Sequence, residues 1–155
     1  MSRSGYMSAS EYDFNDDVDW VLSHGRYLGR LASATRGKRG QALLREMEAA
    51  LLALPEKRLC ADVAVSPRNG EVCAFGAVAL KRKLEVGKTY RAKALAEITA
   101  QFPASNDAPA FAAAFDVAEP LAAEIVHQND DVMVKATAEE RYQHVLAWVQ
   151  EKIKR

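Results

Sequence analysis

The chain has 155 residues, of which 49% are hydrophobic and 27% are charged. Both shares are close to the average of globular proteins, which excludes disordered, collagen-like and fibrous classes and predicts one domain with its own core. The 21 Lys and Arg residues balance 21 Asp and Glu residues, so the net charge gives no reason to expect non-specific binding to polyanions.

The polar N-terminus has no signal-peptide core, and no apolar run is long enough to span a membrane, so we expect a cytoplasmic protein without a membrane partner. Cys60 and Cys73 are too few for a disulfide scaffold and lie among apolar residues, which predicts reduced and structural thiols. Their spacing does not fit a zinc site, and neither a metal nor a cofactor is expected.

The charges are arranged in blocks. Residues 4–25 contain five acids and no Lys or Arg, whereas residues 26–45 contain six bases and no acid. A second basic stretch spans residues 81–93, and residues 94–134 are acidic. Such blocks can pair within the chain or face a partner, and pairing within the chain is the favoured interpretation.

Residues 1–14 are small and polar and are expected to form a flexible segment, followed by a single α-helical domain over residues 15–155. The first helix is predicted to start near Asn15 or Asp16. Gly25 and Gly29 weaken this helix and favour a bend near Gly25. Its apolar residues share one broad face: Val18, Val21, Leu22, Leu28, Leu31 and Ala32.

Residues 37–40, with the sequence Gly-Lys-Arg-Gly, predict a tight turn in which the glycines supply left-handed conformations. The next helix has the clearest apolar stripe in the chain and ends before Pro55. We therefore expect two antiparallel helices with a four-residue connection. The residues of the stripe are Leu43, Leu44, Met47, Ala50, Leu51 and Leu54.

Residues 58–65 alternate as a strand does, and residues 66–70 contain an Asn-Gly turn pair. Residues 71–80 fit a second strand or a helix, and their alanine content favours the helix. The fold class is therefore mainly α: a compact single-domain helical bundle with at most one short β-hairpin. Further helices are predicted over 89–102, over 109–115, over 119–128 with Pro120 in the first turn, and after a Thr137–Glu140 capping box up to Ile153.

Strong catalytic motifs are absent, because the chain has no nucleotide-binding loop, nucleophile elbow or zinc-protease helix, and we do not expect an enzyme. His127 with Asp130 is the remaining candidate for acid–base or metal chemistry. A histidine at a helix C-terminus is the favoured interpretation of this segment.

The predicted partner-binding site is the basic segment. Arginine suits bidentate recognition of carboxylate or phosphate groups. The Gly-Lys-Arg-Gly sequence between two helices has the form of the KH-domain loop that clamps nucleic acid, although the flanking sequence offers little of the sheet that this domain needs. A plain helix–helix turn is therefore favoured. The candidate residues are Arg26, Arg30, Arg36, Lys38, Arg39 and Arg45.

Four segments are distinctive as sequence: the start Met1–Tyr6, residues 33–47, residues 54–59 and residues 70–78. Together they resemble segments of small hypothetical proteins of tailed bacteriophages and prophages. Between Lys83 and Pro109 this chain is longer than the family pattern. The family has no established activity, so the resemblance implies a phage or prophage context and no catalytic residue.

Small phage accessory proteins without catalytic motifs commonly act by stoichiometric binding. The resemblance therefore implies an inhibitor or modulator that binds a host or defence protein, and the basic segment suits an acidic partner surface. The alternative is a nucleic-acid-binding module that uses residues 26–45, and an enzyme is the least favoured hypothesis. The sequence leaves the oligomeric state open.

Overall fold

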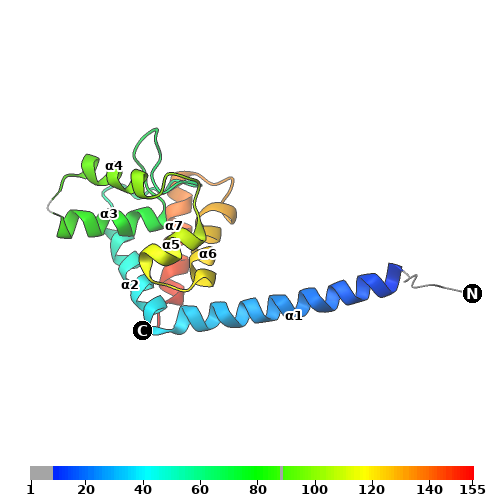
Figure 1. The fold of residues 1–155 in the computed structure, drawn as a ribbon. Helices are drawn as coiled ribbons and strands as arrows, with labels where there is room; N and C mark the ends of the chain where they lie inside the picture. The colour runs from blue at the N-terminus through cyan, green and yellow to red at the C-terminus, as the bar shows by residue number, and fades with distance from the viewer. Residues whose placement is uncertain (1–8, 88) are drawn as a thin grey trace, which may run out of the picture.

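The computed structural model describes residues 9–87 and 89–155, with side chains from Asp19 onward in those ranges (Figure 1). These residues form seven α-helices and one π-helical turn, and their only β pairing is a single antiparallel bridge between Val65 and Val72. The predicted mainly α class is confirmed. In chain order the elements are α1 (Ala9–Arg36), α2 (Lys38–Ala53), α3 (Ala74–Val86), α4 (Arg91–Gln101), α5 (Ala108–Phe115), α6 (Glu119–Val126), η1 (His127–Asp131) and α7 (Ala138–Lys152).

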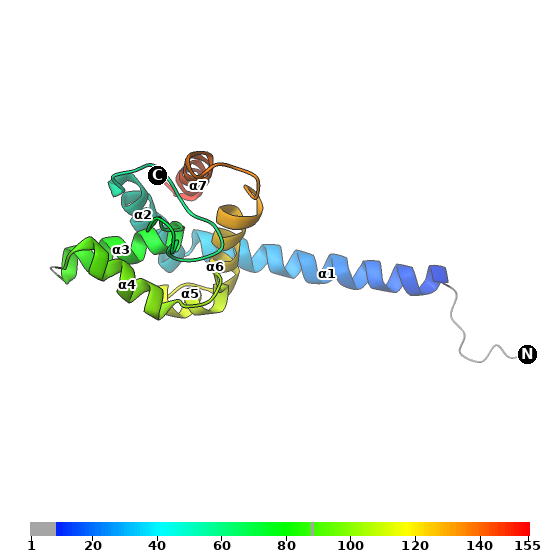
Figure 2. The same ribbon diagram turned by 90° about the horizontal axis from the view of Figure 1, so that it is seen from above.

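Helices α2 to α7 pack into one body, and α1 projects from it (Figures 1 and 2). The predicted stripe of α2 lies in the core, where Leu44, Met47 and Leu51 are fully buried. Phe75 of α3 stacks on Phe111 of α5 with ring centroids 4.5 Å apart. The body is therefore held by one continuous apolar core to which every helix except the outer part of α1 contributes.

The connection between α1 and α2 differs from the prediction. Gly37 alone separates the two helices, so Lys38, Arg39 and Gly40 belong to the first turn of α2, and α2 does not run back along α1 (Figure 1). Gly37 has φ −71°, so no left-handed glycine makes this turn. The glycine that matters is Gly40, where a Cβ would lie 1.9 Å from the carbonyl oxygen of Ala34. Glycine is needed here because two helix backbones meet.

The first helix begins at Ala9, earlier than the predicted start near residue 15, and runs unbroken through Gly25. The expected flexible segment 1–14 thus has helical residues 9–14, and residues 1–8 lie outside the described residues. The body packs on the side of α1 that carries Leu31 and Ala34. The predicted apolar face is largely left in solvent, with Val21 59% and Leu22 53% exposed.

The predicted strand over residues 58–65 is wrong. Asp62 has φ 70°, which interrupts an extended run, and the backbone N–H of Leu59 donates to Ala138 O at 3.1 Å rather than to a strand. Of the hairpin there remain the Val65–Val72 bridge and a few backbone hydrogen bonds, among them Ser66 N–H to Glu71 O at 2.7 Å and Cys73 N–H to Ala64 O at 3.1 Å. The structure confirms that residues 71–80 contain a helix and not a second strand. This helix starts at Ala74, because Cys73 is its N-cap.

In the C-terminal half the observed helices agree more closely with those predicted from the sequence. Pro120 lies in the first turn of α6, where a missing N–H costs no helical hydrogen bond. Thr137 and Glu140 form the reciprocal capping box at the start of α7. The helix predicted over residues 119–128 changes to π geometry at His127. Among the residues that the structure describes, no helix is both long and apolar enough to cross a membrane.

Truncation of the core tests this packing. Leu51→Ala is expected to lower the free energy of unfolding by about 2–5 kcal/mol, because the leucine is 0% exposed and its removal leaves a cavity. Leu52→Ala is the matched control, since Leu52 is 52% exposed and should change stability by no more than about 0.5 kcal/mol. Urea unfolding of both variants measures the difference, and equal midpoints would contradict this core.

Candidate functional site

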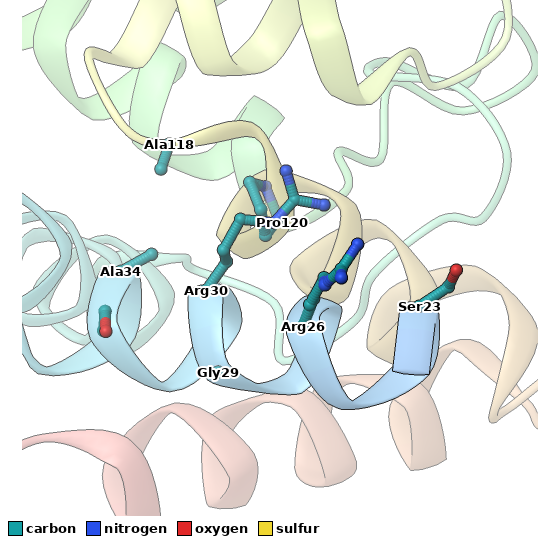
Figure 3. Close-up of a pocket in the computed structure, with 8 residues that line it drawn as sticks. Ser23, Arg26, Gly29, Arg30, Ala34, Ala118 and Pro120 are labelled. Carbon is teal, nitrogen blue, oxygen red and sulfur yellow. The ribbon is translucent and has the colours of Figure 1, made fainter. Parts of the chain in front are cut away.

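An open groove of about 1120 Å³ lies between α1 and the start of α6. Arg26 and Arg30 extend from α1 across this groove toward Pro120 (Figure 3). Ser23 and Ser33 line the same side of α1, and Ala34, Ala118 and Pro120 give the groove apolar walls. The site therefore combines two guanidinium groups with small hydroxyl and apolar side chains.

The position of the two arginines follows from helical spacing, since residues four apart lie one above the other on a helix surface. Both side chains are on exposed residues, and neither forms an ion pair with a carboxylate among the described residues. Burial and nearby Glu124 raise the pKa of Tyr27, whereas the positive charge of Arg30 opposes that rise. Two adjacent cations thus face the groove, and neither is neutralised by an ion pair with a described residue.

The other predicted basic residues are dispersed. Arg39 forms an exposed ion pair with Asp116 at 3.0 Å, and the guanidinium of Arg45 donates to the backbone carbonyl of Lys154. Arg36 lines a second groove of about 500 Å³, beside α7. Lys38 is exposed and forms no ion pair with the described residues. The structure therefore gathers only Arg26 and Arg30 of the six.

The second basic stretch is paired within the chain. Arg82 donates two hydrogen bonds to the carboxylate of Glu46, at 2.6 and 2.7 Å, and these bonds hold the pKa of Glu46 below its usual value. Lys81 pairs with Glu85, and Lys83 pairs with Glu97. The expectation that the charge blocks pair within the chain thus holds for residues 81–83 but not for Arg26 and Arg30.

A buried polar cluster joins the irregular segment 58–73 to the C-terminal helices. The side chain of Asn129 accepts from the N–H of Ala74 at 3.1 Å and donates to Cys60 O at 3.0 Å. Asp130 accepts from the N–H of Asp62, and Arg141 donates to the carbonyls of Asn129, Leu59 and Met133. These bonds satisfy backbone groups that no strand or helix pairs, so the cluster is structural.

The same cluster separates His127 from Asp130. The π turn directs Asp130 inward, where Asn106 donates to it, and leaves His127 on the surface at 3.1 Å from Asp131. The two residues proposed for acid–base chemistry therefore do not face one another. Sequence reasoning missed this cluster, because periodicity does not show that Arg141 and Asn129 turn inward.

The cysteines are free and buried, as predicted. Burial raises the pKa of the Cys60 thiol well above its usual range and that of Cys73 to about 12. The Cys73 sulfur accepts a hydrogen bond from the N–H of Gly76 at 3.4 Å, which caps α3. Neither thiol is placed to act as a nucleophile, because the thiolate is the reactive form.

This burial predicts a pH dependence. A thiol whose pKa is raised by folding contributes stability below its unfolded pKa and loses that contribution as the pH rises, because only the unfolded chain then releases the proton. Between about pH 8.5 and 10, the parent should lose more unfolding free energy than the double variant Cys60→Ala, Cys73→Ala. Urea unfolding at several pH values measures this. Parallel slopes, or alkylation of native protein by iodoacetamide, would contradict it.

No group of three or more His, Cys, Asp or Glu residues is placed to hold a metal ion in the part of the chain that the structure describes. No family model, curated protein or solved structure matches the chain. The geometry of the groove and of α1 is therefore the basis for assigning a function.

Proposed function

We propose that this chain is a phage or prophage accessory protein that binds stoichiometrically to a host or defence protein in the bacterial cytoplasm and thereby inhibits or modulates it. The observation that carries the proposal is the pair Arg26 and Arg30, which faces an open groove without a carboxylate partner among the described residues. The phage context comes from the resemblance of the sequence, and no catalytic step is part of the proposal.

The groove suits an acidic segment of a protein surface. Each guanidinium can donate two parallel hydrogen bonds to one carboxylate, and two of them one helical turn apart match carboxylates spaced along an extended or helical segment. The apolar walls formed by Ala118 and Pro120 would exclude part of the water around such pairs. Their electrostatic attraction would then exceed that of a fully exposed ion pair.

Two features favour a protein partner over a nucleic acid. The half of α1 that precedes Arg26 carries Glu11, Asp13, Asp16, Asp17 and Asp19, and these acids would repel a phosphate backbone that followed the helix. Trp20 of α1 is 64% exposed and stacks on His24, and tryptophan and arginine are both enriched at the energetic centres of protein interfaces.

Charge reversal in the groove tests the proposal. Tagged full-length chain is recovered from bacterial cells as the parent, as Arg30→Glu and as Arg68→Glu, and the proteins that accompany each are quantified by mass spectrometry. The expected result is a partner in near-equal amount with the parent, reduced about tenfold or more by Arg30→Glu. Arg68→Glu is the control, since it makes the same charge change in the exposed 66–70 turn and should retain the partner.

Binding of labelled duplex DNA and RNA at several salt concentrations distinguishes the nucleic-acid alternative. If affinity falls steeply with salt and Arg30→Glu makes that slope shallower, the partner is a nucleic acid. If Arg30→Glu recovers the same proteins in the same amounts as the parent, the groove is not the binding site.

A further inference from the structure

The second groove, of about 500 Å³, lies in the angle between α1 and the helices α6 and α7, which rise from its C-terminal part (Figure 1). Trp148 of α7 lines the wall that faces α1 and is only half-buried. The wall that α1 provides has the three- and four-residue spacing of one helix face. Its residues are Leu28, Leu31, Ala32, Thr35 and Arg36.

The apolar edge of this groove continues along the projecting part of α1. Trp20, His24 and Leu28 follow one another at intervals of four residues, so they share one side of the helix. The rings of Trp20 and His24 are stacked with centroids 4.8 Å apart. Trp20 is 64% exposed and Leu28 is 47% exposed. From Trp20 to Arg36 this strip of α1 is about 24 Å long, or more than four helical turns.

The walls of the groove indicate what kind of backbone can lie in it. All its lining residues belong to helical elements, so it presents side chains and no free strand edge. An extended segment would therefore leave backbone N–H and C=O groups without protein partners, whereas a helix bonds its own backbone. We infer that the groove and the adjoining strip bind an amphipathic α-helix of a partner protein, which lies along α1 with its apolar side chains against Leu28 and Trp148.

Glu124 of α6 gives one end of the groove a negative charge. Its carboxylate accepts a hydrogen bond from the side-chain amide of Gln128 at 2.9 Å and forms no ion pair with a described residue. Burial and the charge of Glu124 raise the pKa of Tyr27, which places this carboxylate near the Leu28 end of the groove. A Lys or Arg of the bound helix would neutralise it.

Arg36 gives the other end a positive charge. It forms no ion pair with a described residue, whereas the other cation of the groove, Lys152, lies 3.7 Å from the carboxylate of Glu151. An Asp or Glu of the bound helix suits this end. Since a helix is positive at its N-terminus and negative at its C-terminus, the bound helix begins at Glu124 and ends at Arg36, and so runs in the same direction as α1.

This inference goes beyond the proposed function and does not rest on it. The second groove shares no lining residue with the groove of Arg26 and Arg30. Arg30→Glu should therefore leave binding of the helix intact, and a substitution of Leu28 should leave binding of an acidic segment intact. The failure of one proposal can thus be told from the failure of the other.

Selection from a displayed library of random peptides is the first test. The peptides have about 16 residues, enough for four helical turns, and are selected on the purified full-length chain. Enriched peptides should carry apolar residues at three- and four-residue spacing, a Lys or Arg before them and an Asp or Glu after them. Arg30→Glu should enrich the same peptides, and Leu28→Asp should not. No enrichment, enrichment only of acidic peptides that Arg30→Glu loses, or the same peptides on Leu28→Asp would overturn the inference.

Tryptophan fluorescence measures the affinity of the most enriched peptide. The chain has two tryptophans, so Trp20→Phe leaves Trp148 as the reporter and keeps an aromatic ring on the strip. Binding should shift the emission to shorter wavelength, and Leu28→Asp should weaken it about tenfold or more. Leu52→Asp is the matched control, since Leu52 is 52% exposed on α2 and should bind like the parent. Equal affinity of the two variants, both melting near the parent's temperature, contradicts the groove as the binding site.

Charge exchange tests the orientation of the bound helix. Glu124→Lys should weaken the enriched peptide, and a peptide with Glu in place of its N-terminal Lys or Arg should recover much of the affinity. Glu56→Lys makes the same charge change in the exposed turn after α2 and should have little effect. If exchange of the acid in the C-terminal half of the peptide restores binding instead, the helix lies in the reverse direction and the assigned orientation is wrong.

Sedimentation equilibrium of the purified chain tests a second copy as the occupant. Leu28→Asp should leave the mass of the parent unchanged, because the inferred occupant belongs to another protein. A mass of twice 17.0 kDa that falls to that of one chain in Leu28→Asp would show that a second copy fills the groove, and the inference would then be wrong.

Discussion

The close meeting of α1, α2 and α6 at Gly40, with the end of α7 beside it at Gln41, fixes the position of α1 on the body. A Cβ on this residue would overlap the carbonyl of Ala34 and would also lie 3.1 Å from the Leu121 side chain of α6. Beside it, the buried amide of Gln41 donates to Thr35 O and Lys152 O and accepts from the N–H of Lys154. One glycine and one glutamine thus join the end of α1 to the start of α2 and the end of α7.

This junction determines both surfaces of α1. Because the helix is held only at its C-terminal end, the side next to α6 becomes one wall of the groove that contains Arg26 and Arg30 (Figure 3). The side that carries Leu28 and Ala32 lines the second groove, beside α7. The two surfaces follow from one constraint, although they involve different side chains and have different chemistry.

The sequence predicted those features whose signals are local. The α2 stripe, the Thr137–Glu140 capping box and the position of Pro120 depend on spacing and on helix-end chemistry, which neighbouring residues define. The predicted strand over residues 58–65 failed for a non-local reason. Its backbone groups bond to Asn129, Asp130 and Arg141, about 70 to 80 residues away in the chain, and no alternation pattern reveals those partners.

The candidate site was predictable in composition but not in arrangement. Arg26 and Arg30 were among the six predicted residues, and their four-residue spacing on one helix is a local property that places them side by side. It could not show that Arg39 would pair with Asp116 or that Arg45 would bond to the chain end, since both contacts join segments far apart in the chain. The apolar residues of α1 were visible in the sequence, but such a pattern does not distinguish burial in a core from exposure on an arm.

The projection of α1 frees its outer residues from the requirements of folding. Residues 19–26 contribute nothing to the body's core, so substitutions there leave its stability nearly unchanged, whereas most substitutions in a packed helix lower it. Many side chains can therefore be exchanged on this arm without loss of the fold. The molecule is divided into a body that tolerates little variation and an arm that tolerates much.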